Sequence, residues 1–250
     1  MRVDVVTLFP RMFEILKEDG ITGRAVKAGL LRLNVWNPRD FAQNNYRSVD
    51  DKPYGGGPGM VMLYQPMRDA IHAARREHSG NSRVLYLSPQ GRCFTQAVAS
   101  KLVDELDNIV LVAGRYEGVD ERVINREIDD ELSIGDYVLS GGELAAMVVI
   151  DAITRLIPGA LGHEESALQD TFNGGLLEFP QYTRPEEIDG QHVPAVLLSG
   201  DHQAILRWRR KQALGRTWQK RPDLLQKKQL TEEESRLLDE YLDETESKTT

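Results

Sequence analysis

The sequence has almost no cysteine and no long apolar run. Cys93 is the single cysteine among 250 residues, so an intramolecular disulfide is impossible, and no Cys/His cluster has zinc-site spacing. The longest uninterrupted apolar run, residues 144–150, is far shorter than the ~20 residues that span a bilayer. The segment before Pro10 carries Asp4 and is not typical of a signal peptide. These absences exclude a disulfide-stapled secreted fold and predict a cytoplasmic protein with no membrane contact.

The common nucleotide-binding signatures are also absent. Neither GxxxxGK[ST] nor a GxGxxG that joins a strand to a helix occurs, which argues against a P-loop or a standard dinucleotide fold. Three other glycine-rich turns do occur, PYGGGPGM at 53–60, AGRYEGVDER at 113–122 and SIGDYVLSGGE at 133–143. Glycines after strands let a backbone approach a ligand closely, and parallel sheets bind ligands at the carboxyl ends of their strands. A glycine-rich turn taken alone is more often an ordinary tight turn than a ligand site, but three such turns in one domain favour a site.

Short β-branched runs alternate with helix-like segments in the first 160 residues. This alternation predicts an α/β fold around a mostly parallel sheet. A largely apolar stretch, residues 144–157, predicts a helix that is buried on most sides and stopped by Pro158. The expected strands are residues 3–8, 31–36, 83–88, 108–113 and 131–134, and the expected helices before 144 are residues 11–17, 65–78, 95–106 and 120–126.

The composition changes after Pro158, and the chain length allows one or two domains. Apolar periodicity is lost over the Gly- and Glu-rich stretch that follows, and a helical pattern without a convincing strand resumes from Gly200. We therefore expect an α/β domain at 1–160, a flexible interdomain linker at 161–175 and a helical C-terminal domain at 176–250.

Charge is distributed unevenly along the chain. The net charge of −8 argues against a nucleic-acid partner, but residues 202–228 hold nine Lys or Arg against one acid. Residues 231–250 hold eight acids against two basic residues. Trp208 and Trp218 lie among the arginines of this basic block. The block is either a solvated helix face or a surface that contacts phosphates.

Six segments match one family pattern in the same order along the chain. They are VDVVTLFP, PYGGGPGM, LYLSPQG, AGRYEGVDER, SIGDYVLSGGELAA and LQDTFNGGLLEFPQYTRP. Together they resemble the bacterial tRNA (guanine-N1)-methyltransferase family, TrmD, as far as about Pro185 and more loosely beyond. The resemblance implies a SPOUT fold, in which a parallel sheet is threaded into a deep trefoil knot, and a homodimer. Base rates oppose a knot, and periodicity alone does not indicate one.

The resemblance also implies the reaction and its ligands. S-adenosylmethionine binds within the knot, and its methyl group goes to N1 of the guanosine at position 37, in the anticodon region of tRNA; no DNA partner is expected. Gly141 and Gly142 could equally form the turn into a helix. The resemblance places the donor against three loops, which contain Tyr86, Leu87, Ser88 and Pro89, then Gly114, Tyr116 and Glu117, then Ile134, Gly135, Asp136, Tyr137, Val138, Leu139, Gly141 and Gly142.

The chemistry at guanine N1 requires a base, because N1 carries a proton at neutral pH. A positive or donor group must also stabilise the charge that grows on O6. By resemblance, Asp170 is the general base, Arg155 stabilises O6 and Glu117 holds the guanine edge. Each has a structural alternative as well: an Asx-turn for Asp170, an ion pair with Asp151 for Arg155, and an ion pair with Arg115 or Arg122 for Glu117.

Four further positions refine the comparison with the family. Thr171 follows the predicted base where serine is expected, and Ala145 and Ala146 stand where some relatives carry proline. Neither difference removes a functional group. Glu178 is a second acid that could help to hold Mg²⁺, which the resemblance implies as a possible cofactor.

Two other functions remain open at this point. One keeps the SPOUT fold but acts on ribosomal RNA, and the acid in LQDTF argues for N1 chemistry instead. The other is a non-catalytic RNA-binding factor that works through the basic block.

Overall fold

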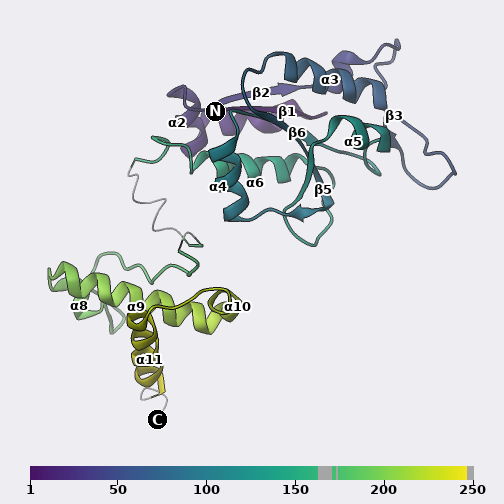
Figure 1. Ribbon diagram of the computed structural model, residues 1–250. Coiled ribbons are helices and arrows are strands. Elements are labelled where there is room, and N and C mark those ends of the chain that lie inside the picture. The colour runs from purple at the N-terminus through teal and green to yellow at the C-terminus, as the bar shows by residue number, and fades with distance from the viewer. Residues whose placement is uncertain (163–170, 173, 247–250) are drawn as a thin grey trace. The chain divides into compact units, whose positions relative to one another are not determined.

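The computed structural model describes residues 1–162, 171–172 and 174–246. The chain forms two compact units, residues 1–164 and 165–250, which are described separately (Figure 1). No helix in these described ranges is both long and apolar enough to cross a membrane.

A five-stranded parallel sheet forms the centre of the first unit (Figure 1). Its strand order is β2-β1-β6-β5-β7, and every neighbouring pair is parallel. The predicted α/β fold with a central parallel sheet is therefore confirmed, and each predicted strand overlaps an observed one. The strands are β1 (Arg2–Val6), β2 (Arg32–Trp36), β5 (Ser82–Cys93), β6 (Asn108–Ala113) and β7 (Asp130–Ser133).

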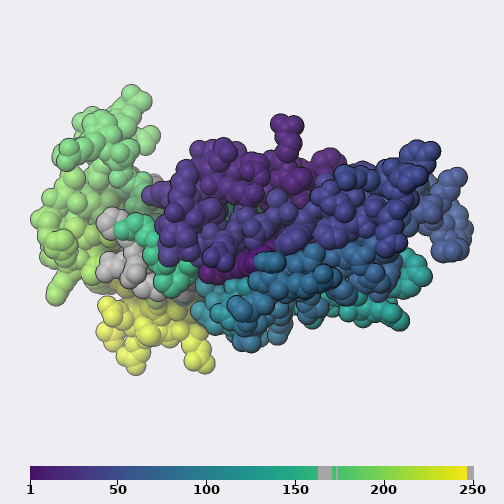
Figure 2. All heavy atoms as spheres, turned by 90° about the horizontal axis from the view of Figure 1, so that it is seen from above, coloured from purple at the N-terminus to yellow at the C-terminus, as the bar shows by residue number. Residues whose placement is uncertain are grey.

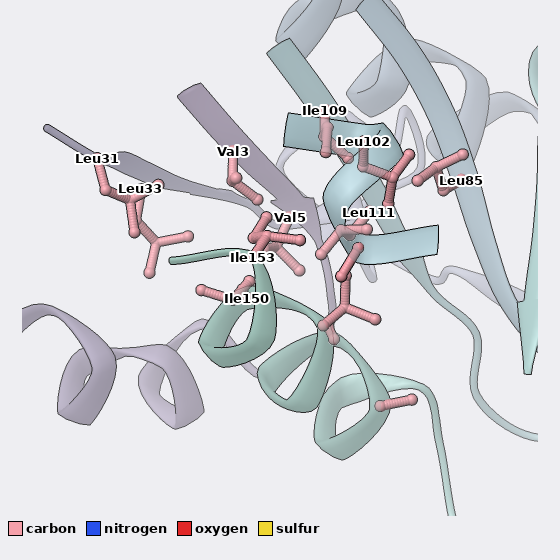
Figure 3. Close-up of a cluster of buried hydrophobic side chains, with 14 of the residues drawn as sticks. Val3, Val5, Leu31, Leu33, Leu85, Leu102, Ile109, Leu111, Ile150 and Ile153 are labelled. Carbon is pink, nitrogen blue, oxygen red and sulfur yellow. The ribbon is translucent and has the colours of Figure 1, made fainter. Parts of the chain in front are cut away.

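Helices cover both faces of this sheet. Alternate strand residues point to opposite faces, so Val3 and Val5 join one buried cluster while Val6 joins the other. Figure 3 shows Ile150 and Ile153 of α6 packed in the first cluster beside Val5 and Leu111. The first face carries α1 (Glu14–Glu18), α2 (Gly20–Lys27), α4 (Gln96–Glu105) and α6 (Glu143–Thr154), and the second carries α3 (Tyr64–Arg76) and α5 (Glu121–Glu127).

Helix α6 is buried on all sides except one strip. Leu144 and Val148 are about half exposed on this strip, one turn apart. The helix ends at Thr154, earlier than predicted, because its last turn tightens: Leu156 N donates to Ile153 O and Ile157 N to Thr154 O. Pro158 therefore follows a turn that has already left the α-helix.

The sequence analysis did not predict α2, and it gave the preceding segment as one helix. The residues that α2 buries are small: Thr22, Gly23 and Ala25. A Cβ on Gly23 would lie 2.6 Å from the backbone carbon of Glu18, so the two short helices touch through bare backbone. Small residues give little hydrophobic periodicity, which explains the omission. The segment before α2 is a 3₁₀ turn (Pro10–Phe13) followed by α1.

A second 3₁₀ turn (Pro38–Phe41) and the short antiparallel pair β3 (Asp50–Asp51) and β4 (Val61–Met62) were not predicted either. The glycine-rich segment PYGGGPGM connects β3 to β4. Its four glycines all have positive φ, and Tyr54 is fully exposed. In the space-filling view the blue atoms of this region lie at one end of the first unit (Figure 2).

The second unit is largely helical. A small buried cluster of Leu176, Ala213, Leu214 and Leu237 holds it together, and Gly215 lies directly against the ring of Tyr241. Asp201 caps the longest helix by accepting hydrogen bonds from Gln203 N and Ala204 N. The elements are β8 (Glu187–Ile188), β9 (Gln191–His192), α8 (Ala195–Leu198), α9 (His202–Lys220), α10 (Pro222–Gln226) and α11 (Glu232–Glu246).

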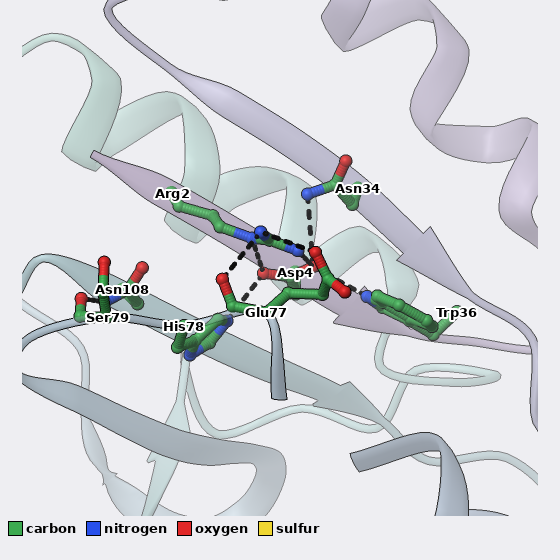
Figure 4. A network of polar contacts seen from close by, with 8 residues as sticks. All are labelled: Arg2, Asp4, Asn34, Trp36, Glu77, His78, Ser79 and Asn108. Carbon is green, nitrogen blue, oxygen red and sulfur yellow. Dashed lines mark hydrogen bonds and ion pairs between the residues drawn. The ribbon is translucent and has the colours of Figure 1, made fainter. Parts of the chain in front are cut away.

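A buried carboxylate joins β1 to β2 and to the chain after α3 (Figure 4). Asp4 is fully buried and accepts from Arg2 Nε at 2.7 Å, Trp36 Nε1 at 2.7 Å and Asn34 Nδ2 at 3.2 Å. His78 Nε2 lies 2.8 Å from the same carboxylate. Burial raises the pKa of Asp4, but the hydrogen bonds from Arg2, Trp36 and His78 outweigh it and leave the pKa below its ordinary 3.8. The carboxylate is therefore ionised in the folded protein.

We predict that Asp4→Asn lowers the free energy of unfolding by roughly 3 kcal/mol at neutral pH, because Arg2 loses its buried partner. The lowered pKa means that the native protein holds this stabilisation above the unfolded pKa and loses it as the pH falls through the folded pKa. The variant should therefore lose less stability than the native protein as the pH falls below 3.8. Urea unfolding at several pH values measures both effects.

Asp40→Asn is the matched control, because Asp40 pairs with Arg47 at 3.6 Å on the open surface. Asp40→Asn should lower the free energy of unfolding by less than about 1 kcal/mol. Equal losses from both variants would contradict a special role for the buried network.

Candidate functional site

A cavity of about 350 Å³ lies where β5, β6 and β7 approach their carboxyl ends. This is the edge at which parallel sheets bind ligands. The register of β5 on β7 is broken here, since Leu87 and Arg92 both align with Leu132. The residues between them bulge out of the ladder, as often happens beside functional sites.

Nearly all of the predicted donor-site residues line this cavity. The exception is Asp136, which lies in the third loop but not on the wall. Sequence analysis missed several other wall residues, although most are direct neighbours of predicted ones. The predicted residues on the wall are Tyr86, Leu87, Ser88, Pro89, Gly114, Tyr116, Glu117, Ile134, Gly135, Tyr137, Val138, Leu139, Gly141 and Gly142, and the missed ones are Gln90, Arg115, Gly118, Leu132, Ser133, Ser140 and Ala145.

Glycine is required where two of the loops meet. A Cβ on Gly142 would lie 2.8 Å from Ala113 Cα, and Gly142 N donates to Gly114 O at 2.9 Å. The backbones of the second and third loops are thus in direct contact. Gly142 is also the N-cap of α6, which confirms the expected turn into a helix.

The first loop contributes the aromatic ring of Tyr86. A Cβ on Gly114 would lie 2.7 Å from its hydroxyl oxygen, so the ring fits only against a glycine. Burial, with a smaller contribution from the charge of Glu131, raises the pKa of Tyr86. The phenol is therefore neutral and cannot act as a base near neutral pH.

Glu117 forms part of the cavity wall, and the PYGGGPGM segment holds it there. Glu117 N donates to Met60 O at 2.9 Å, and a side chain on Gly59 would overlap the Glu117 side chain. The alternative ion pairs expected for Glu117 are wrong. Arg115 pairs with Glu143, and Arg122 pairs with Asp120.

The structure describes two of the three predicted catalytic residues, Glu117 and Arg155. Arg155 caps the C-terminal end of α6, where its N donates to Asp151 O, and it is not on the cavity wall. Asp170 lies outside the described residues. Of the two described residues, Glu117 lines the cavity and Arg155 does not.

No metal site is formed by the described residues, among which no three His, Cys, Asp or Glu side chains gather. Glu178, the predicted contributor to a Mg²⁺ site, instead accepts a hydrogen bond from Gln181 Nε2 at 2.7 Å.

Known proteins resemble this chain over most of its length. The family model described as "tRNA (Guanine-1)-methyltransferase TrmD" matches residues 1–227. The tRNA (guanine-N(1)-)-methyltransferase of Pseudoalteromonas atlantica is 60% identical over 240 residues, which cover 96% of this chain and 90% of the relative. The enzymes of the same name from Aeromonas hydrophila (58%, covering 98% of both chains) and Salmonella newport (59%, covering 96% and 94%) are similarly close. The chain therefore belongs to the TrmD family of tRNA (guanine-N1)-methyltransferases.

Proposed function

We propose that this enzyme transfers a methyl group from S-adenosylmethionine to N1 of the guanosine at position 37, beside the anticodon of tRNA. The observation that carries the proposal is the cavity at the carboxyl ends of β5, β6 and β7, with walls of three loops, of which the second and third contribute glycines. A chain with this substrate is expected in the cytoplasm.

The cavity suits the methyl donor in size and chemistry. Its volume of about 350 Å³ lies in the range of small-molecule sites. Backbone groups of the three loops can bind the adenine edge without charged residues. When bound, the donor supplies an electrophilic methyl group on a sulfonium.

The residues of this chain then prepare the guanine. Asp170 removes the N1 proton and Arg155 stabilises the negative charge that develops on O6. Glu117 holds the guanine edge, consistent with its place on the cavity wall against Gly59. The proton of N1 leaves to the carboxylate as the new N–C bond forms and the sulfonium carbon–sulfur bond breaks.

We further propose that residues 1–160 form a knotted SPOUT domain, 161–175 a flexible linker and 176–250 a tRNA-binding domain. The protein acts as a homodimer in this scheme. The half-exposed strip of α6, with Leu144 and Val148 one turn apart, supports an apolar contact between subunits.

Methyl incorporation tests the function. The protein is incubated with a bulk tRNA pool or ribosomal RNA and labelled S-adenosylmethionine, and the modified nucleoside is then mapped. We expect 1-methylguanosine at tRNA position 37. Label found only in ribosomal RNA would favour the other SPOUT methylase, and no label at all would favour a non-catalytic RNA-binding factor.

We predict that Asp170→Asn reduces turnover by roughly 10²–10⁴-fold, the usual effect of losing a general base, and leaves donor binding nearly intact. Single-turnover kinetics and donor titration measure the two quantities. Glu178→Gln is the matched control and should cost less, because Glu178 is bonded to Gln181. A loss of donor affinity with unchanged turnover would contradict the assignment.

Mixed dimers show which subunit supplies the base. Asp170→Ala and Gly141→Trp homodimers should both be inactive, the first without its base and the second with a blocked donor cavity. If Asp170 acts across the dimer, refolding the two together restores one working site in each mixed dimer. Inactive mixed dimers would place the base within its own subunit.

The basic residues of α9 fall into two groups, those that form ion pairs with α11 and those that do not. The acidic tail forms α11, which packs on α9, and Lys211 Nζ lies 2.6 Å from Glu244. Arg207 and Arg210 pair with Glu240 and Glu234. The charge asymmetry of the sequence is therefore largely neutralised on this face.

Three other cations of α9 have no acidic partner in the described part of the chain. They are Arg209, Arg216 and Lys220, spaced 7 and 4 residues apart and thus on one helical face. The guanidinium of Arg209 lies 4.8 Å from the Phe179 ring, which orients it without neutralising it. We assign the tRNA phosphate contacts to this face.

We predict that replacing Arg209, Arg216 and Lys220 by Gln raises the KM for tRNA and flattens its salt dependence. Each lost phosphate contact removes about 0.9 from the logarithmic salt slope on duplex. The matched control replaces Arg207, Arg210 and Lys211, and should lower thermal stability with a smaller change in slope. If both triple variants have the same salt slope, the assignment of the phosphate contacts to the face without ion pairs is wrong.

A further inference from the structure

Glu143 carries a buried carboxylate to which the proposed methyl transfer assigns no role. It is the first residue of α6, it directly follows Gly141 and Gly142, and it is 1% exposed. It does not itself line the cavity. Burying a carboxylate is costly unless hydrogen bonds or an opposite charge compensate, so its partners are informative.

Three separate segments contact this carboxylate or its ion-pair partner. Thr7, directly after β1, donates its hydroxyl to Glu143 Oε1 at 2.9 Å. Arg115 lies in the loop after β6, and its Nε is 2.8 Å from Glu143 Oε2. The two groups form an ion pair, but their geometry does not meet that of a hydrogen bond. The same guanidinium donates from Nη1 to Ser140 O at 3.0 Å. Glu143 therefore connects the end of β1, the second cavity loop and the third cavity loop.

The guanidinium of Arg115 is held from its other side as well. Its central carbon lies 4.3 Å from the centre of the Phe9 ring. Phe9 N donates to the hydroxyl of Thr7 at 2.9 Å, so the ring is fixed by the same residue that holds Glu143. Arg115 thus occupies a slot whose two walls are both tied to Thr7.

The slot is continuous with the cavity wall. Gly114 and Tyr116, the neighbours of Arg115, both line the cavity. Tyr116 has φ +60°, a conformation that non-glycine residues keep only when their surroundings impose it. A side chain on Gly141 would overlap Arg115 and lie 2.6 Å from Glu143 Oε2. The ion pair and the donor loops are therefore in direct contact.

We propose that Glu143 is a positioning residue which, through Thr7 and Arg115, fixes the second and third loops in the conformation that binds the methyl donor. The inference rests on the proposed function, since S-adenosylmethionine is the ligand concerned. Without the carboxylate charge, Arg115 remains in its slot with no counter-charge, and the Gly114–Gly118 turn loses its anchor.

Calorimetric titration with S-adenosylmethionine tests the inference. Glu143→Gln, which preserves size, should raise the Kd for the donor about tenfold, the cost expected of an uncompensated buried polar group. Thr7→Val should act in the same direction, and Thr7→Ser, which keeps the hydroxyl, should restore native binding. The affinity for tRNA should not change in any of these variants.

Asp4→Asn is the matched control, because Asp4 is an equally buried carboxylate of the same unit whose partners do not line the cavity. It should lower the unfolding temperature and leave the donor Kd unchanged. If Glu143→Gln binds the donor with the native Kd, or if Asp4→Asn raises that Kd by the same factor, the inference about Glu143 is wrong and the proposed function still stands. If the native protein does not bind the donor at all, the proposed function is overturned together with it.

Discussion

The contact between the backbones of Ala113 and Gly142 is the constraint on which the cavity depends. It brings the loop after β6 against the loop before α6 without any side chain between them. At this contact the cavity wall is formed by main chain, and the buried carboxylate of Glu143, which is not on the wall, lies behind it. A contact of this kind is rigid because close-packed main chain leaves little room for movement.

The central strands β1 and β6 could be predicted because each is largely a run of β-branched or aliphatic residues buried on both faces. Asn108–Ala113 is fully buried and was predicted at its observed limits. Helix α2 could not be predicted, because its buried residues are small and its contact with α1 is through backbone. Hydrophobic patterns report buried side-chain area, and here there is little of it.

Most of the cavity lining could be predicted because the resemblance identified whole loops, and residues adjacent in a loop line the same cavity. The supporting ion pair could not. Sequence spacing favoured a pair between Glu117 and a nearby arginine, but Arg115 pairs with Glu143, 28 positions away, and Arg122 with Asp120. The acidic tail was treated as separate from the basic block for the same reason, since packing of α11 on α9 cannot be deduced from charge counts.

The strand order has a consequence for synthesis of the protein on the ribosome. β1 is made first, yet it lies between β2 and β6, and Val3 aligns with Ile109. At the usual rate of translation, roughly 5 to 20 seconds separate the emergence of these two strands. During that interval one edge of an apolar strand has no partner, a state that favours association with other chains. The nascent protein must therefore depend on early cover of this edge, by helices of its own or by a chaperone.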